Sequence, residues 1–408
     1  MKYRFKSPDF STIGYVLFFI AIVENRFMEY KPVLMVLYVL RIIFAVKGYY
    51  LIFIHLKKTR RLLYPGLLLL QLLYSIVIIV SGVVNHNITL GIIYSIFIWI
   101  GITHYILNSS KTNSAFLRVI DSMFKLVAIL TLALTILLPG VMITYSYDGT
   151  RIIEGFYGGK NALPMYLVTG LCLNLMVFES DGSRKLWRRF LYPLICIILL
   201  FASGSGTGSV IAIIFMILYY TKLYKFINTY NTMIIHTITI FSVVVFRLQE
   251  RYLYPLIVDV LHRDITLTYR TDIWAIAIKY FSRNCFLGYG LGNNVIALNL
   301  ALPGWYQFII NETHNGILDV ALSLGILGLI PFLAFIFVII RTYDNSENKS
   351  ISQIMKLYLF IYFAGAISES AFTLSRLTFW SMLFIGLAVI DSNATGDIKT
   401  GLRAEIYE

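Results

Sequence analysis

Long apolar runs follow one another along almost the whole chain, and short polar segments separate them. A helix that crosses a bilayer needs about 20 mainly apolar residues, because each residue adds only about 1.5 Å to its length. The pattern therefore predicts about twelve transmembrane helices, although several runs are shorter than that. The predicted spans are 11–23, 33–55, 62–82, 89–107, 119–139, 162–178, 190–203, 208–220, 232–247, 315–340, 354–373 and 377–391.

Composition supports a lipid environment for most of the chain. Hydrophobic residues make up 58% of the 408 positions and charged residues only 13%, whereas about 25% of the residues in soluble domains are charged. The predicted fold class is an all-α polytopic membrane protein with one large extracytoplasmic loop. We expect one integral unit in three parts: transmembrane helices at 1–247, the loop at 248–314, and further transmembrane helices with a cytoplasmic tail at 315–408.

The net charge of +13 comes mostly from short loops that share one side if the spans alternate. The loops at 57–61, 184–189 and 222–225 are rich in Lys and Arg, whereas those at 85–87 and 203–209 contain none. Cytoplasmic loops of membrane proteins carry this excess of positive charge. We therefore predict an inner-membrane protein with both termini in the cytoplasm. The cations form no basic tail, so nucleic acid is not an expected partner.

Cysteine spacing predicts neither a disulfide framework nor a metal site. Cys172, Cys196 and Cys285 are scattered, and no set of His, Cys and carboxylate residues has the spacing of metal ligands. We therefore expect no metal and no cofactor.

The loop at 248–314 is the longest connection in the chain, and connections of this length are usually functional. Its segment Thr271–Tyr280 has the amphipathic pattern of a helix at a membrane surface. Arginine offers a forked donor group that suits phosphate, so a cluster of arginines predicts an anion site. Ordinary solvated charge is the alternative for each one. The arginines in or beside the loop are Arg247, Arg251, Arg263, Arg270 and Arg283.

Gly288, Gly290 and Gly292 form a G-x-G-x-G run within the same loop. The run lacks the G-x-G-x-x-G spacing of a dinucleotide site and follows no predicted strand. It favours a tight turn that places the loop against the membrane.

Two further polar groups are predicted at the outer ends of the helices. The Ser-Gly-rich segment 203–209, with Ser205 and Thr207, interrupts an apolar stretch. Backbone amides at the start of the following helix could hold an anionic oxygen, and a flexible hairpin is the alternative. Glu369 and Arg376 flank the last outer hairpin and could pair with each other.

His314 is the candidate general base. It lies in the sequence Glu312-Thr-His-Asn-Gly, where the loop re-enters the membrane. Histidine side chains titrate near neutral pH and can accept a proton there; a structural helix cap is the alternative. Asn315 and Asp319 lie nearby, and Asp319 could orient the histidine ring.

Three segments together resemble the signature of the O-antigen ligase/polymerase superfamily. They are Arg270-Thr-Asp-Ile-Trp274, Asn284–Gly292 and Thr313–Leu318, which match R-x-x-x-W, a G-x-G-x-G turn and H-N-x-x-L in that order. The motifs cover about fifty residues, and the predicted topology is similar over the whole chain. This superfamily contains WaaL-type O-antigen ligases and Wzy-type repeat-unit polymerases.

The resemblance implies a GT-C-like fold and metal-independent, inverting glycosyl transfer from a glycan on undecaprenyl diphosphate. It places Arg270 at the diphosphate and His314 as the base, with the tryptophan and the glycines in support. Family members carry an arginine near the position of Ser209, and this chain lacks it. Another cation or the backbone amides could replace that arginine. The candidate diphosphate ligands are therefore Arg270, Arg247, Arg263, Arg376, Ser205 and Thr207.

The acceptor separates the possible reactions. A chain rich in Ile, Phe, Tyr and Asn indicates an AT-rich genome, which favours a polymerase of capsule, exopolysaccharide or O-antigen repeat units over a ligase to lipid A-core. A flippase would bury ionisable residues near the bilayer midplane, where only Arg41 and Lys47 are expected. A non-catalytic scaffold is a further alternative. Expected partners are lipid-linked donor and acceptor glycans, membrane lipid, and flippase and chain-length regulator proteins.

Overall fold

A computed structural model describes residues 10–23, 30–109, 114–145, 151–153, 155–156, 161–181, 190–252, 254–260, 265, 269–301 and 312–404. These residues form a bundle of helices with a small antiparallel hairpin of β1 (Ile143–Tyr145) and β2 (Arg151–Ile153), in which Ile143 pairs with Ile153. The helices are α1 (Phe10–Ile22), α2 (Lys31–Thr59), α3 (Pro65–Val84), α4 (Leu90–Ser109), α5 (Ser114–Leu137), α6 (Pro139–Met142), α7 (Ala162–Asp181), α8 (Tyr192–Ala202), α9 (Gly206–Tyr220), η4 (Leu223–Phe226), α10 (Thr229–Thr239), η5 (Ile240–Val245), α11 (Leu248–Tyr252), η6 (Pro255–Val260), α12 (Arg270–Arg283), α13 (Asn293–Ala301), α14 (Gly316–Asp344), α15 (Lys349–Ala366) and α16 (Leu377–Ala404).

Each predicted apolar run overlaps a helix of the described chain. The run 232–247 covers both α10 and η5, and the run 354–373 extends beyond the end of α15 at Ala366. Six of these helices are long and apolar enough to cross a bilayer: α2, α3, α4, α5, α7 and α14. Shorter apolar helices include α8, α9 and the apolar part of α16. The protein is therefore an all-α polytopic membrane protein, while the count of about twelve spans stays a prediction.

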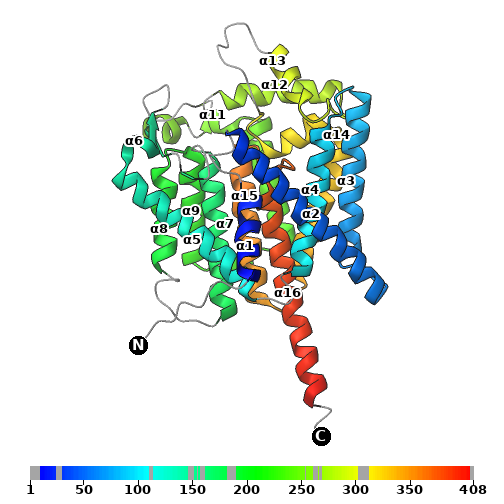
Figure 1. The fold of residues 1–408 in the computed structure, drawn as a ribbon. Helices are drawn as coiled ribbons and strands as arrows, with labels where there is room; N and C mark the ends of the chain where they lie inside the picture. The colour runs from blue at the N-terminus through cyan, green and yellow to red at the C-terminus, as the bar shows by residue number, and fades with distance from the viewer. Residues whose placement is uncertain are drawn as a thin grey trace.

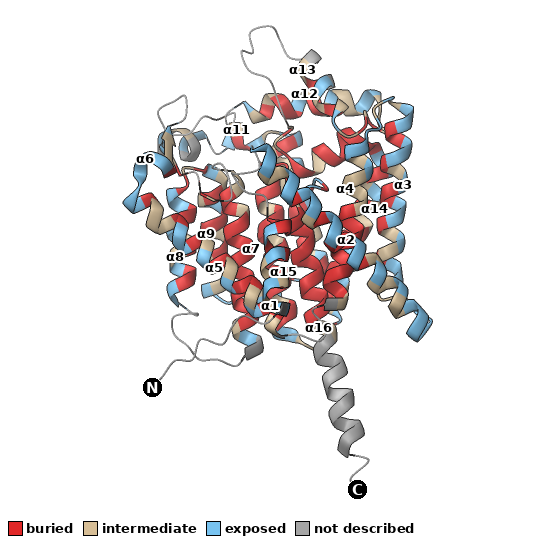
Figure 2. Cartoon of the chain, viewed as in Figure 1, coloured by how far each residue is buried: buried red, intermediate tan, exposed pale blue. Residues whose placement is uncertain are grey.

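The outer helices expose apolar side chains in stripes. On α2 the exposed residues recur every three or four positions and so share one helix face; they are Val36, Val39, Ile43, Val46, Tyr50 and Phe53. Figure 2 shows such exposed faces on the outside of the bundle and buried residues along α7, α15 and α16. Soluble proteins seldom expose large contiguous apolar patches, so these stripes fit contact with lipid.

The two segments that carry the candidate chemistry meet at one end of the bundle. Helices α12 and α13 lie across this end, whereas α16 leaves the bundle at the opposite end (Figure 1). The predicted amphipathic segment 271–280 is helical, because α12 spans Arg270–Arg283 and buries Ile273, Trp274 and Ala277.

The loop is fastened to a break in α14. Gly325 has φ 63° and ψ −164°, so the helical hydrogen-bond ladder is interrupted there. Segments 285–290 and 322–327 exchange four backbone hydrogen bonds of 2.7–3.1 Å across this break. Backbone N–H and C=O groups that lose their helical partners inside a membrane protein need other protein partners. The loop segment 285–290 supplies them at the break in α14.

The glycine run forms the predicted turn. Gly288, Gly290 and Gly292 have φ values of 63°, 83° and 93°, which is the left-handed region that favours glycine. A Cβ atom at Gly288 would lie 2.5 Å from the Leu322 carbonyl oxygen, and one at Gly290 would lie 2.4 Å from the Asn87 side chain. Both positions therefore need glycine for close packing as well as for backbone conformation.

Buried ionisable residues are more numerous than the sequence analysis expected, because Asp121 and Lys125 form a buried ion pair within α5. Their spacing of four residues puts both on one helix face. Of the two cations expected near the midplane, Arg41 is buried and its Nε donates to the Ala21 carbonyl at 2.9 Å. Lys47 is exposed and lies 5.3 Å from the Tyr105 ring centre.

Candidate active site

Helix α12 connects the candidate arginine to the histidine segment. Arg270 is its first residue, and Trp274 lies four positions later, about one turn along the helix. Trp274 is fully buried, and its indole Nε1 donates a hydrogen bond of 3.1 Å to the Thr313 carbonyl. The tryptophan therefore fixes the backbone immediately before His314 against the helix that starts at Arg270.

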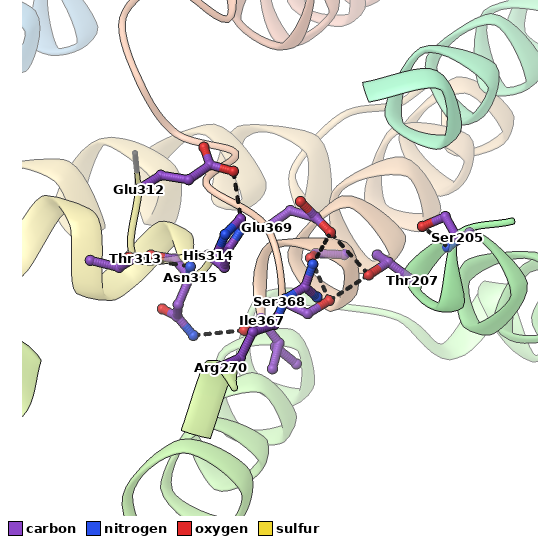
Figure 3. A network of polar contacts seen from close by, with 12 residues as sticks. Ser205, Thr207, Arg270, Glu312, Thr313, His314, Asn315, Ile367, Ser368 and Glu369 are labelled. Carbon is purple, nitrogen blue, oxygen red and sulfur yellow. Dashed lines mark hydrogen bonds and ion pairs between the residues drawn. The ribbon is translucent and has the colours of Figure 1, made fainter. Parts of the chain in front are cut away.

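Asn315 holds the other side of His314. Its side-chain Oδ1 caps α14 by accepting from the amides of Ile317 and Leu318 at 3.1 and 2.9 Å. Its Nδ2 donates to the Ile367 carbonyl at 2.9 Å (Figure 3), which ties α14 to the connection between α15 and α16. His314 thus sits between two anchored neighbours.

Asp319 supports His314 through the backbone and does not orient its ring. The Asp319 Oδ1 atom accepts from both the amide and the hydroxyl of Thr313, at 3.1 and 2.6 Å. Glu312 is the ring's neighbour, because His314 Nδ1 lies 3.1 Å from Glu312 Oε1. The expected contact with Asp319 is therefore wrong. His314 has a φ of 52°, so the chain is not helical there and helix spacing does not predict the ring's partner.

A second group of contacts surrounds Glu369, in the connection between α15 and α16. Arg270 Nη2 donates to Glu369 Oε1 at 2.9 Å, and the Thr207 hydroxyl donates to the same oxygen at 3.2 Å. The Ser368 hydroxyl lies 2.7 Å from that of Thr207 (Figure 3). Arg270 is 16% exposed and Glu369 7%. Glu369 therefore pairs with Arg270, whereas the sequence analysis considered Arg376.

The Ser-Gly-rich segment is part of this group, because Thr207 lies in the first turn of α9. Ser205 caps α9 by accepting from the Gly208 amide at 3.1 Å. The Thr207 hydroxyl donates to the carboxylate of Glu369, so a side chain makes this contact, and anion binding by the backbone amides stays a prediction.

The two acidic side chains differ in their electrostatic surroundings. Burial raises the pKa of Glu369 above its ordinary value, and the positive charge of Arg270 offsets this only in part. Burial acts the same way on Glu312, but contact with His314 and the charges of His314 and Arg376 outweigh it and hold the Glu312 pKa below its ordinary value. Glu312 is therefore the more readily ionised of the two.

The remaining arginine candidates occupy different positions. Arg376 lines a cavity with Glu312, Glu369, Tyr166 and Tyr362. Arg247 donates to the Thr271 carbonyl and lies 3.4 Å from Asp272 and 3.7 Å from Glu250, so it braces the start of α12. Arg263 lies outside the described residues. Arg270 and Arg376 are thus the arginines that the described chain places beside the carboxylates.

Comparison with known proteins finds a family match over part of the chain. Residues 191–333 match the model of a family described as O-antigen ligase, and this range contains the glycine turn, Arg270 and His314. This match over less than half of the chain agrees with the resemblance to the O-antigen ligase/polymerase superfamily. The chain is 26% identical over 131 residues to a Rickettsia conorii protein with the provisional name polysaccharide ligase. This match covers 30% of the chain and 32% of that protein, or about a third of its length.

The structure adds one grouping that sequence spacing missed. Glu312, His314 and Glu369 bring potential metal-ligand atoms within 4.8 Å of one another. Arg270 lies 2.9 Å from Glu369, and a guanidinium at that distance opposes a second cation by like-charge repulsion. The signal for Glu312 was present in the sequence, two residues before the histidine, whereas Ser368 and Glu369 approach from a distant segment.

Proposed function

We propose that this protein is a polymerase that joins undecaprenyl-diphosphate-linked oligosaccharide repeat units by metal-independent, inverting glycosyl transfer. One observation carries the proposal: Arg270 and His314, which come from different segments, both contact carboxylates of one cluster, Glu369 and Glu312. A cation for the leaving group and a base for the acceptor are the two groups that this reaction requires.

Each group has a chemical role in the proposed reaction. Arg270 stabilises the negative charge that develops on the departing diphosphate. His314 removes the proton from the acceptor hydroxyl as its oxygen attacks the anomeric carbon. The new C–O bond forms opposite the breaking one, so the configuration inverts. Glu312, 3.1 Å from His314 Nδ1, holds the ring and stabilises the imidazolium that forms.

The proposed setting is the bacterial inner membrane, with both termini cytoplasmic and the loop 248–314 on the outer face. The expected partners are lipid-linked donor and acceptor, together with flippase and chain-length regulator proteins. Ligation of glycan to lipid A-core is the second candidate, and the names of the matched family and of the Rickettsia protein favour it. The two reactions share Arg270 and His314 and differ in the acceptor.

Purified protein incubated with a lipid-linked repeat unit alone tests this proposal. A ladder of longer lipid-linked products identifies a polymerase, whereas a reaction that starts only after addition of lipid A-core identifies a ligase. Translocation of the substrate across proteoliposomes without any elongation would favour a flippase.

His314→Ala and Arg270→Ala are the site variants for the same assay. Loss of the base should lower the rate by about 10²–10⁴-fold, and loss of the arginine should be comparably severe. His55→Ala and Arg283→Ala are the controls, since Arg283 lies at the far end of α12 and packs 5.0 Å from the Tyr280 ring centre. Full activity of the site variants would refute the assignment. The reaction should proceed in EDTA, and its loss there would indicate a metal at the Glu312 cluster.

A further inference from the structure

The carboxylate of Glu369 accepts hydrogen bonds from residues of two other elements. Arg270 belongs to α12 and Thr207 to α9, and both donate to the same atom, Glu369 Oε1, at 2.9 and 3.2 Å. Ser368 joins the group through Thr207 (Figure 3). A buried anionic oxygen therefore sits where an arginine and the first turn of a helix meet.

The same set of donors would suit a phosphate oxygen. Arginine forms charge-assisted hydrogen bonds with carboxylates and phosphates in similar geometry, and helix N-termini favour negative charge of either kind. A phosphate bound by Arg270 at this point would place its charge against that of Glu369. Two anions that close cannot share the donors without a large repulsion, so one must leave.

We propose that Glu369 is a displaceable counter-ion: it neutralises Arg270 while no lipid diphosphate is bound, and it yields Arg270 to the diphosphate when substrate binds. The inference rests on the proposed function, because it takes the diphosphate as the ligand of Arg270. It adds that substrate binding is an exchange of anions, and that the return of Glu369 to Arg270 helps to expel the lipid diphosphate product.

The place to which the carboxylate can move is close. Ligand-type atoms of Glu369, Glu312 and His314 lie within 4.8 Å of one another. A carboxylate released from Arg270 therefore needs only a small movement to approach His314. There its charge would add to that of Glu312 in stabilising the imidazolium formed during the reaction, which couples occupation of the phosphate site to the strength of the base.

Binding of undecaprenyl diphosphate to the purified full-length protein tests the exchange without turnover. Glu369→Gln keeps the size of the side chain and removes its charge, so the diphosphate no longer competes for Arg270. We expect the Kd of the Glu369→Gln variant for undecaprenyl diphosphate to fall about tenfold, which corresponds to about 1.4 kcal/mol. Glu369→Ala should change the Kd in the same direction and serves if the Gln variant folds poorly. With substrate, Glu369→Gln should lower KM and also lower kcat, because product leaves more slowly.

Glu250→Gln is the matched control. Glu250 pairs with Arg247 beside the start of α12, so its neutralisation makes the same change in net charge without freeing Arg270. Its Kd should change less than twofold, which separates a local exchange from a general effect of charge. Arg270→Ala should weaken binding at least tenfold.

Two results would contradict these statements in different ways. If Glu369→Gln and Glu369→Ala bind diphosphate no more tightly than the unmodified protein while Arg270→Ala loses binding, Glu369 is a fixed part of the site and the exchange is overturned. If Arg270→Ala binds as tightly as the unmodified protein, Arg270 is not the phosphate ligand. The proposed function then loses its diphosphate contact, and the exchange falls with it.

Discussion

Asn315 has two roles that substitutions can separate: it caps α14, and it connects α14 to the segment that follows α15. Its Oδ1 caps the helix, and its Nδ2 donates to the Ile367 carbonyl at 2.9 Å. Asn315→Asp keeps an oxygen that can cap α14 and replaces the amide donor with an acceptor. Asn315→Ala removes both interactions. The two variants therefore differ in the cap and agree in the loss of the connection to residue 367.

The expected energies follow from these contacts. Loss of an N-cap costs about 0.5–2 kcal/mol. Loss of the Nδ2 donor leaves the Ile367 carbonyl without its hydrogen bond. Because Asn315 is fully buried, this loss costs about 1–3 kcal/mol. Asn315→Asp should therefore destabilise the protein by about 1–3 kcal/mol, and Asn315→Ala by about 1 kcal/mol more. Reversible unfolding by SDS titration in mixed micelles measures both values.

Activity provides the decisive comparison. The connection to Ile367 fixes the position of His314 relative to Ser368 and Glu369, so both variants should lose at least about tenfold in kcat under conditions where they are folded, because small misplacements of reacting groups are costly. Asn315→Asp with full kcat would refute the claim that this hydrogen bond aligns the two halves of the site. Equal stability of the two variants would refute the role of the cap.

Two further predictions concern the break in α14 and the response to acid. Gly325→Ala should destabilise the protein by at least about 3 kcal/mol in the same SDS titration. Its backbone conformation is almost restricted to glycine, and a Cβ there would lie 2.2 Å from the Phe286 carbonyl oxygen. Gly66→Ala is the control: its Cβ would meet no atom within 4 Å, so the free energy of unfolding should stay near that of the unmodified protein. Because the pKa of Glu312 is lower in the folded protein than its ordinary 4.5, its stabilising contact is present above that pH and is lost as the pH falls through the lowered pKa. The melting temperature should therefore fall less below pH 4.5 in Glu312→Gln than in the unmodified protein, and parallel curves would contradict this role.

The helices were predictable from sequence because the bilayer imposes a simple rule on apolar runs. The glycine turn was predictable as well, because closely spaced glycines usually mark backbone with positive φ. The helix at α12 followed from its amphipathic pattern. These are local properties, and they need no knowledge of which segments meet.

The partners within the site were not predictable in the same way. Glu312 lies next to His314 in sequence, but a left-handed residue at position 314 removes the helical spacing on which the choice of Asp319 depended. Glu369 and Arg270 are 99 residues apart, and only the folded chain brings the start of α12 to the connection after α15. The break at Gly325 is visible in sequence only as one glycine among apolar residues.

The fastening of the loop to the broken helix has a consequence for how the protein is made. Segment 285–290 leaves the ribosome before segment 322–327, so their four hydrogen bonds can form only after segment 322–327 has been synthesised. Completion of the site is thus a late event: a nascent chain that ends before Gly325 can contain Arg270 and His314 but lacks both the full anchor of the glycine turn and Glu369.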